Sequence, residues 1–193
     1  MAGDRIYLAS ASPRRRQLLE QLGMRFEVLV AKVDESPRPH EPPIDYVERL
    51  ARAKAETALG RLGQSAVLVL AADTAVALDG AILGKPRDRE DGLSMLARLS
   101  GRSHHVLSAV ALARRGKLEV AVSESRVGFR AITSREAEAY WETGEPCDKA
   151  GGYGIQGQGA VFVERLEGSY SGVMGLPLFE TAELLRRAGM SVF

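Results

Sequence analysis

The chain has 193 residues, of which 45% are hydrophobic and 26% are charged, and its formal net charge is +1. This size and composition predict a single globular domain over residues 1–193. The sequence has neither the apolar core of a signal peptide nor the ~20 apolar residues of a membrane span, so we expect a cytoplasmic protein without a membrane partner. The even mixture of basic and acidic residues argues against a nucleic-acid partner. The single Cys147 excludes an intrachain disulfide.

Hydrophobic periodicity and turn residues predict strands and helices that alternate along the chain. Strands are expected at 6–9, 26–31, 66–72, 76–78, 82–83, 106–113, 118–130 and 161–166. Helices are expected at 13–22, 45–62, 88–99, from 133 or 134 to 143, and at 177–188, with a glycine-rich loop over 150–159. Hairpins join antiparallel strands and helical crossovers join parallel strands, so both kinds of strand pair are expected. We therefore predict an α/β protein with a mixed sheet flanked by helices.

The segment from Leu8 to Leu19 reads as a strand end, a turn with two serines, and a helix that begins with arginines. Ser12 suits the N-cap of this helix, and Pro13 suits its first position. The arginines lie at the positive end of the helix dipole, which costs a few tenths to ~1 kcal/mol each. Free N–H groups, hydroxyls and guanidinium groups together favour a bound phosphate. A solvated basic first turn is the alternative.

Acidic residues follow two of the expected strands. Asp73 comes directly after the apolar run 66–72, and the end of a central strand is typical of a general base or metal ligand. The alternative is a carboxylate that caps the next turn. Asp34 and Glu35 also follow a strand, and they either share a divalent cation with Asp73 or form a solvated turn.

Two lysines are candidates for contacts with phosphate. Lys54 falls on the apolar face of the helix expected at 45–62, where a lysine that extends its ammonium to solvent is the alternative. Lys85 stands between Gly84 and Pro86 at the end of a hairpin, and these neighbours fix it for a charged contact. The spacing of a Walker loop is absent, so a P-loop nucleotidase is not predicted.

The loop from Gly152 to Gly157 matches the pattern Gly-x-Gly-x-x-Gly. A dinucleotide-binding loop needs a helix after this pattern, and here a strand is expected, so we reject that interpretation. The amide of Gln156 can both donate to and accept from the edge of a nucleobase. A flexible glycine loop is the alternative.

Taken together, these segments resemble the Maf family of nucleotide pyrophosphatases, also called septum formation inhibitor proteins. The matching segments occur in the family's order and cover nearly the whole chain. They are LASASPRR at 8–15, VDE at 33–35, RLARAKA at 49–55, ADT at 72–74, GKPR at 84–87, LSG at 99–101, GEP at 144–146, DKAG at 148–151, YGIQG at 153–157 and VMGLP at 173–177.

The resemblance implies a fold similar to that of inosine triphosphate pyrophosphatases, with a deep central cleft between two lobes. It also implies hydrolysis of a nucleoside triphosphate between the α and β phosphates. A divalent cation (Mg²⁺, Mn²⁺ or Co²⁺) is the implied cofactor, and a homodimer is the implied assembly. The loop YGIQG is similar to that of the dTTP/UTP branch. The alternatives are the same chemistry on 7-methyl-GTP or a modified nucleotide, and a non-catalytic regulator of septum formation.

The resemblance further implies roles for individual residues. Asp73 matches the proton acceptor that activates water, and Asp73 and Glu35 are the implied metal ligands. Positions that set substrate choice are matched by Arg14, Thr74 and Gln156. Residues that contact phosphates or organise the metal are matched by Ser10, Arg15, Glu35, Lys54 and Lys85.

Overall fold

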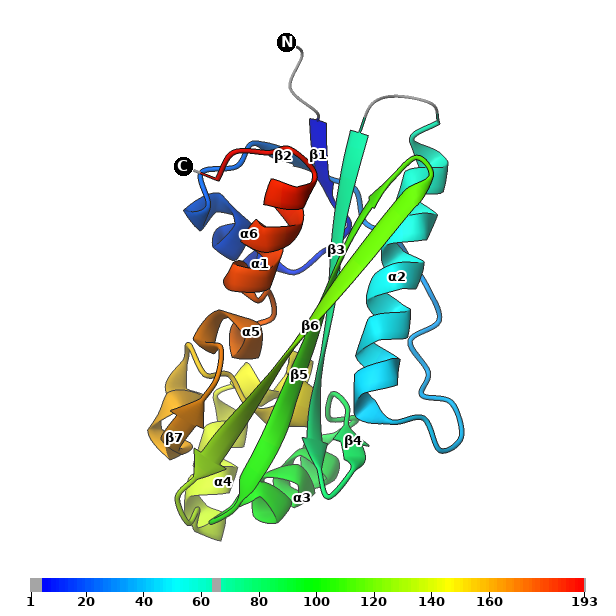
Figure 1. The fold of residues 1–193 in the computed structure, drawn as a ribbon. Coiled ribbons are helices and arrows are strands. Elements are labelled where there is room, and N and C mark those ends of the chain that lie inside the picture. The colour runs from blue at the N-terminus through cyan, green and yellow to red at the C-terminus, as the bar shows by residue number, and fades with distance from the viewer. Residues whose placement is uncertain (1–4, 64–66, 193) are drawn as a thin grey trace.

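The structure is a computed structural model that describes residues 5–63 and 67–192. Over these residues, seven strands form one mixed sheet in the order β2-β1-β3-β5-β6-β7, with β4 paired to β3 (Figure 1). The strands are β1 (Arg5–Leu8), β2 (Phe26–Val28), β3 (Val67–Leu78), β4 (Ala81–Leu83), β5 (Ser103–Arg114), β6 (Lys117–Phe129) and β7 (Val163–Glu167). Strand β1 is parallel to β2 and β3, and the other pairs are antiparallel. The predicted mixed α/β fold is confirmed.

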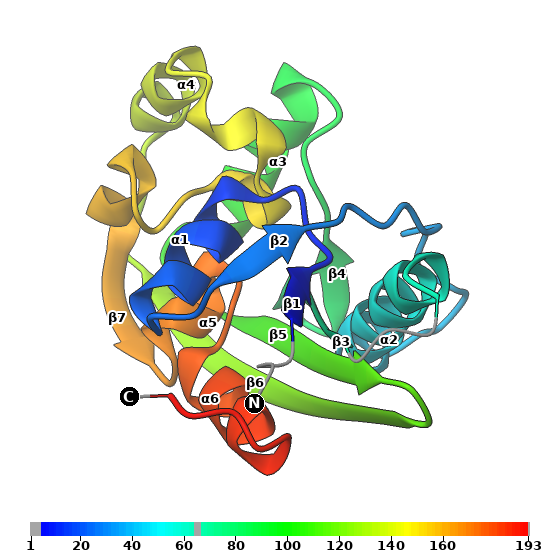
Figure 2. The ribbon, with the colours of Figure 1, turned by 90° about the horizontal axis from the view of Figure 1, so that it is seen from above.

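Helices cover both faces of the sheet. The helices are α1 (Pro13–Gln21), α2 (Pro43–Arg61), α3 (Arg89–Leu99), α4 (Ser134–Glu142), α5 (Tyr170–Met174) and α6 (Leu178–Arg187), and the 3-10 turns are η1 (Glu145–Asp148), η2 (Ala150–Gly152) and η3 (Gln158–Phe162). Helix α2 lies on one side of the sheet, and α1, α5 and α6 lie on the other (Figure 2). Helices α3 and α4 lie near β4 and β7 at the far end (Figure 1). No helix in the described part of the chain is long and apolar enough to cross a membrane.

The alternation of side chains along β3 explains this layered arrangement. Val69 and Ala71 pack with α2, whereas Leu68 and Leu70 pack with α1 and α6 on the opposite face. Both faces of β3 are therefore buried, which accounts for a sequence that is apolar apart from Asp73 and Thr74. The residues of α2 that meet the sheet include several alanines, and these short side chains allow close packing.

The end predicted for the central strand at residue 72 is wrong. Strand β3 continues to Leu78 in antiparallel pairing with β5, and Asp73 lies opposite Ala109 within this pair. The parallel neighbour β1 does end nearby, because its last residue, Leu8, is opposite Leu70. Asp73 is therefore three residues past the point where its parallel neighbour β1 ends. The first residue of the expected strand 66–72 lies outside the described residues.

The remaining boundaries differ by a few residues from those predicted. The strand expected at 161–166 is β7 at Val163–Glu167, preceded by η3, and α5 was not predicted. The separate strand expected at 76–78 is the last part of β3. Its turn into β4 is confirmed at Asp79 and Gly80, whose φ angles are 53° and 78°. Positive φ at both central residues is the geometry of a tight hairpin turn, for which Asp-Gly is favoured.

Candidate active site

A buried ammonium group joins two of the predicted acidic residues. Lys54 comes from α2, and its Nζ atom donates a 2.6 Å hydrogen bond to Oδ1 of Asp73 on β3. The same Nζ atom lies 2.6 Å from Oε1 of Glu35, which belongs to the segment after β2. The side chains of Lys54 and Asp73 are both 9% exposed, and that of Glu35 is 55% exposed. Lys54 therefore does not extend to solvent, and that alternative is wrong.

Burial and neighbouring charges act in opposite directions on these carboxyl groups. Burial raises the pKa of Asp73 above its ordinary value, although the charges of Lys54 and Arg15 oppose the rise. Burial also disfavours ionised Glu35, but the hydrogen bond and charge of Lys54, with the charges of Lys85 and Arg15, hold the pKa of Glu35 below its ordinary value. Asp73 is thus the more basic of the two carboxylates, which suits a proton acceptor.

Arg15 turns back from the first turn of α1 toward the sheet. Its Nε atom donates to the carbonyl of Gly175 at 2.7 Å, and its Nη2 atom donates to Oγ1 of Thr74 at 3.3 Å. A longer contact of 3.5 Å joins its Nη1 atom to Oγ of Ser10. Ser12 caps α1, as predicted. The polar partners of Arg15 explain why an arginine is tolerated at the positive end of this helix.

Thr74 and Ser108 connect this arginine to the middle of the sheet. The Oγ1 atom of Thr74 lies 2.8 Å from Oγ of Ser108, which donates to the carbonyl of Gly172 at 2.6 Å. Sequence reasoning missed Ser108, although a single hydroxyl in the apolar run 106–113 was a usable signal. It also missed Tyr46, whose hydroxyl donates to the backbone carbonyl of Glu35 at 2.9 Å. No sequence pattern pointed to that contact.

The other predicted site residues lie farther from this cluster. Lys85 is exposed after β4, and its charge acts on Glu35. Arg14 is half-buried, and its charge acts on Asp148 and on Arg15. Gln156 is exposed in the glycine-rich loop, and in the described part of the chain its side chain is not hydrogen-bonded to the Lys54 or Arg15 groups.

Two of the loops that carry these outer residues are joined by their backbones. The N–H of Gly151 donates to the carbonyl of Gly84 at 2.9 Å. This bond brings the start of the glycine-rich loop beside the Gly84-Lys85 segment. The loop with Gln156 and the loop with Lys85 are therefore neighbours in the fold.

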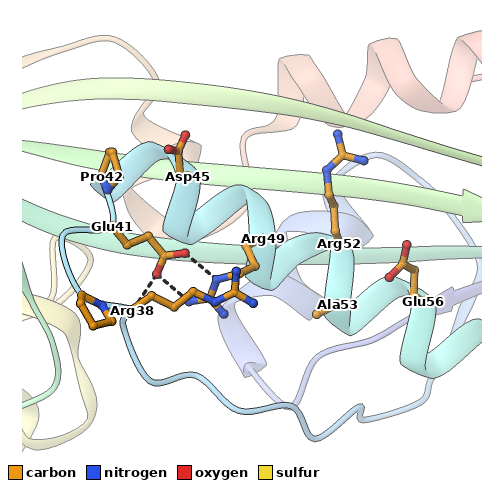
Figure 3. A pocket seen from close by; sticks show the side chains of 9 residues that line it. Arg38, Glu41, Pro42, Asp45, Arg49, Arg52, Ala53 and Glu56 are labelled. Carbon is orange, nitrogen blue, oxygen red and sulfur yellow. Dashed lines mark hydrogen bonds and ion pairs between the residues drawn. The ribbon is translucent and has the colours of Figure 1, made fainter.

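A pocket of about 620 Å³ lies over residues 45–56 of α2 and the loop before this helix (Figure 3). Two of its charged groups pair with each other, because Glu41 accepts two hydrogen bonds from Arg49, at 2.5 and 2.7 Å. Lys54 is not among its lining residues, so this pocket is separate from the Lys54 cluster. The lining residues are Arg38, Pro39, Glu41, Pro42, Asp45, Arg49, Arg52, Ala53 and Glu56. The central cleft expected between two lobes stays a prediction.

Comparison with known proteins identifies the family. The Maf-like protein family model matches residues 5–188. A relative from Methylobacillus flagellatus named dTTP/UTP pyrophosphatase is 54% identical over 188 residues, which cover 97% of this chain and 94% of the relative. A Nitrosomonas europaea relative of the same name is 50% identical and covers 100% of this chain and 98% of the relative. A solved HAM1 protein from Coxiella burnetii is 16% identical, with a TM-score of 0.47 and coverage of 96% of this chain and 98% of that one. Because the family model matches most of its length, the chain belongs to the Maf-like protein family.

Proposed function

We propose that this chain hydrolyses nucleoside triphosphates, dTTP and UTP ahead of others, to the nucleoside monophosphate and pyrophosphate. The observation that carries the proposal is the buried pair of Lys54 and Asp73, with Glu35 on the same ammonium group and Arg15 nearby. This group combines cations for phosphates with a carboxylate whose pKa is raised, as activation of water requires. The name dTTP/UTP pyrophosphatase, carried by relatives at 50–54% identity, supports the same substrates.

Asp73 is the proton acceptor of the proposed reaction. A water molecule attacks the α-phosphorus while Asp73 takes one of its protons. A new bond forms between the water oxygen and the α-phosphorus, and the bond from that phosphorus to the bridging oxygen breaks. The electron pair of the broken bond leaves with pyrophosphate. Lys54 holds Oδ1 of Asp73 and so orients the carboxylate.

Several cationic groups hold the triphosphate, because one lysine does not balance its charge. Arg15 and Lys54 line the inner end of the site, and exposed Lys85 meets the phosphates from the outer side. The hydroxyl of Ser10 lies beside Arg15 and contributes a further phosphate contact. Arg14, Thr74 and Gln156 set the choice of nucleotide. Thr74 does so partly through Arg15, to which it is hydrogen-bonded.

Glu35 and Asp73 are the proposed ligands of a divalent cation. Both carboxylates converge on one Nζ atom, and hard oxygen donors of this kind suit Mg²⁺. The described residues contain no group of three or more His, Cys, Asp or Glu side chains that could hold a metal ion, so phosphate oxygens and water would complete the coordination. When bound, the cation would neutralise charge on the phosphates.

We also propose that residues 1–193 form one domain and that the chain is a homodimer in the cytoplasm. It has no membrane or nucleic-acid partner in this proposal. The near-neutral formal charge of +1 supports the last point. Light scattering after gel filtration tests the dimer, and the dimer part fails if the mass is that of one chain at micromolar concentration.

Release of pyrophosphate from a panel of nucleotides, with Mg²⁺, Mn²⁺ or Co²⁺, tests the activity. We expect dTTP and UTP to release monophosphate and pyrophosphate in equal amounts. Release of inorganic phosphate instead would contradict cleavage between the α and β phosphates, and a preference for 7-methyl-GTP would contradict the nucleotide choice. An inactive protein with salt-sensitive DNA binding would favour the regulatory alternative.

A further inference from the structure

The carboxylate of Glu145 lies under the glycine-rich loop and bonds its backbone. Its Oε2 atom accepts the N–H of Gln158 at 2.8 Å, and its Oε1 atom accepts the N–H of Gly159 at 3.0 Å. Oε1 also accepts the hydroxyl of Tyr140 at 2.7 Å, and that hydroxyl accepts the N–H of Gly154 at 3.0 Å. One carboxylate and one phenol therefore bind the loop on both sides of Gln156.

The close approach of the loop to Glu145 explains why it is rich in glycine. A Cβ atom on Gly157 would lie 2.1 Å from Oε2 of Glu145, and one on Gly159 would lie 2.5 Å from the hydroxyl of Tyr140. Side chains at these positions would push the loop off its support. The glycines thus bring the backbone within hydrogen-bonding distance of the carboxylate, which gives them a role in packing.

The other end of the loop is also held. The hydroxyl of buried Tyr153 lies 2.8 Å from Nε2 of His104, and the ring of Tyr153 packs edge-on against Phe129. The stretch from Tyr153 to Gly159 is therefore fixed at both ends. The exposed side chain of Gln156 stands at the tip between these two supports.

Glu145 itself is poorly suited to touch a triphosphate. Burial disfavours its ionised form, but the hydrogen bonds from Tyr140, Gly159 and Gln158 hold its pKa below the ordinary value. The group is therefore an anion at neutral pH, and it would repel phosphates. Its oxygens are already used by the loop, so its effect on a nucleotide acts through the backbone.

We infer that Glu145, with Tyr140, is a positioning residue that fixes the backbone around Gln156 and thereby sets the selectivity of the enzyme for its nucleobase. The inference rests on the proposed function, because it takes Gln156 as the group that reads the base. A displaced amide leaves hydrogen-bonding groups of the base unpaired, and such mismatches are costly in a site built on hydrogen bonds. Loss of Glu145 should therefore reduce selectivity more than turnover.

The test compares Glu145→Gln and Tyr140→Phe with the wild type. The ratio of kcat/KM for dTTP to that for dCTP should fall about tenfold in Glu145→Gln, and less in Tyr140→Phe, which leaves two of the carboxylate's bonds to the loop intact. kcat for dTTP should change by less than about threefold, because the proton acceptor is untouched. Amide hydrogen exchange should become faster at Gln158 and Gly159 in Glu145→Gln, and at Gly154 in Tyr140→Phe, because these N–H groups lose their acceptors.

Glu142→Gln is the matched control. Glu142 ends α4 three residues before Glu145, and its exposed carboxylate faces Arg89 at 3.6 Å. This variant should keep the selectivity and the exchange rates of the wild type. If Glu145→Gln does not fold, Tyr140→Phe decides the question, because it keeps the aromatic ring and removes the hydroxyl alone.

An unchanged selectivity ratio in a folded variant with faster exchange overturns the inference, because the loop would then move without effect on base choice. Unchanged amide hydrogen exchange in a folded Glu145→Gln variant overturns the inference as well. If the wild type releases pyrophosphate from no nucleotide, the proposed function fails on its own. In that case, calorimetry measures the affinities of the wild type and of Glu145→Gln for the monophosphates dTMP and dCMP. A smaller difference between the two affinities in Glu145→Gln supports the role of Glu145, and an unchanged difference refutes it.

Discussion

Substitution of Lys54 by methionine tests how the buried charges hold the site together. The side chains of Lys54 and Asp73 are both 9% exposed, so solvent screens their interaction little. Removal of one partner of a buried ion pair costs about 3–5 kcal/mol. Glu35, with 55% of its side chain exposed, adds little to this cost. In a domain of this size 1 kcal/mol lowers Tm by roughly 2–4 °C, so we expect Lys54→Met to lower Tm by roughly 6–20 °C.

Arg52→Met is the control for this measurement. Arg52 is on the same helix, and it makes a 2.7 Å ion pair with Glu48 in which both side chains are about 40% exposed. Such a surface pair contributes roughly 0.3–0.5 kcal/mol, so the control should lower Tm by no more than about 2 °C. Denaturant and thermal unfolding of both variants give the comparison. Equal losses of Tm in the two variants would refute the view that burial strengthens the ion pair of Lys54 and Asp73.

The loss in Lys54→Met should also depend on pH. Burial raises the pKa of Asp73 in the folded state, and the charge of Lys54 opposes this rise. Without Lys54 the pKa of Asp73 in the folded state rises further above its unfolded value. The folded state of the variant therefore favours the protonated form of Asp73 more strongly than the unfolded state does. Stability is then retained below the ordinary aspartate pKa and lost as pH rises through the folded pKa. Lys54→Met should therefore lose less stability at pH 5 than at pH 8, and an opposite trend would contradict this assignment.

Three further predictions concern activity. Asp73→Asn should lower kcat by ~10²–10⁴-fold with a native circular dichroism spectrum, and near wild-type turnover would remove Asp73 from the mechanism. Arg15→Ala should lower both kcat/KM and Tm, because Arg15 donates hydrogen bonds to Gly175 and Thr74. Lys85→Ala should lower kcat/KM alone, because Lys85 is exposed. Wild-type kcat/KM in both variants would mean that the phosphates bind elsewhere. Gln156→Ala should narrow the preference for dTTP and UTP over dATP and dGTP, and an unchanged preference in a nucleotide panel would assign base recognition to another residue.

Local features of the fold could be predicted from the sequence because they depend on neighbouring residues. The cap at Ser12 and the Asp79-Gly80 turn are set by short-range hydrogen bonds and backbone geometry. The apolar face of α2 could also be predicted, since it follows from the helical period. The end of β3 was misplaced, because Asp73 is a poor strand former whose burial depends on Lys54 and Arg15, which lie far away in the sequence.

The candidate site was predicted as a set of residues but not as an arrangement. The contact of Lys54 with both Asp73 and Glu35 depends on how α2 packs on the sheet, which periodicity does not specify. The role of Glu145 could not be predicted from the residues alone. It arises where a 3-10 turn brings a side chain beneath a loop that follows it by about ten residues.

The bond between Arg15 and the carbonyl of Gly175 joins residues 160 positions apart, which has a consequence for the order of folding. Contacts of such long sequence separation form late, because the chain entropy lost in closing them is large. During synthesis, α1 leaves the ribosome long before α5, so the guanidinium of Arg15 lacks the carbonyl of Gly175 until residues 170–175 emerge. A chain that ends before α5 would contain Lys54, Asp73 and Glu35, yet its arginine would lack the anchor that directs it into the site.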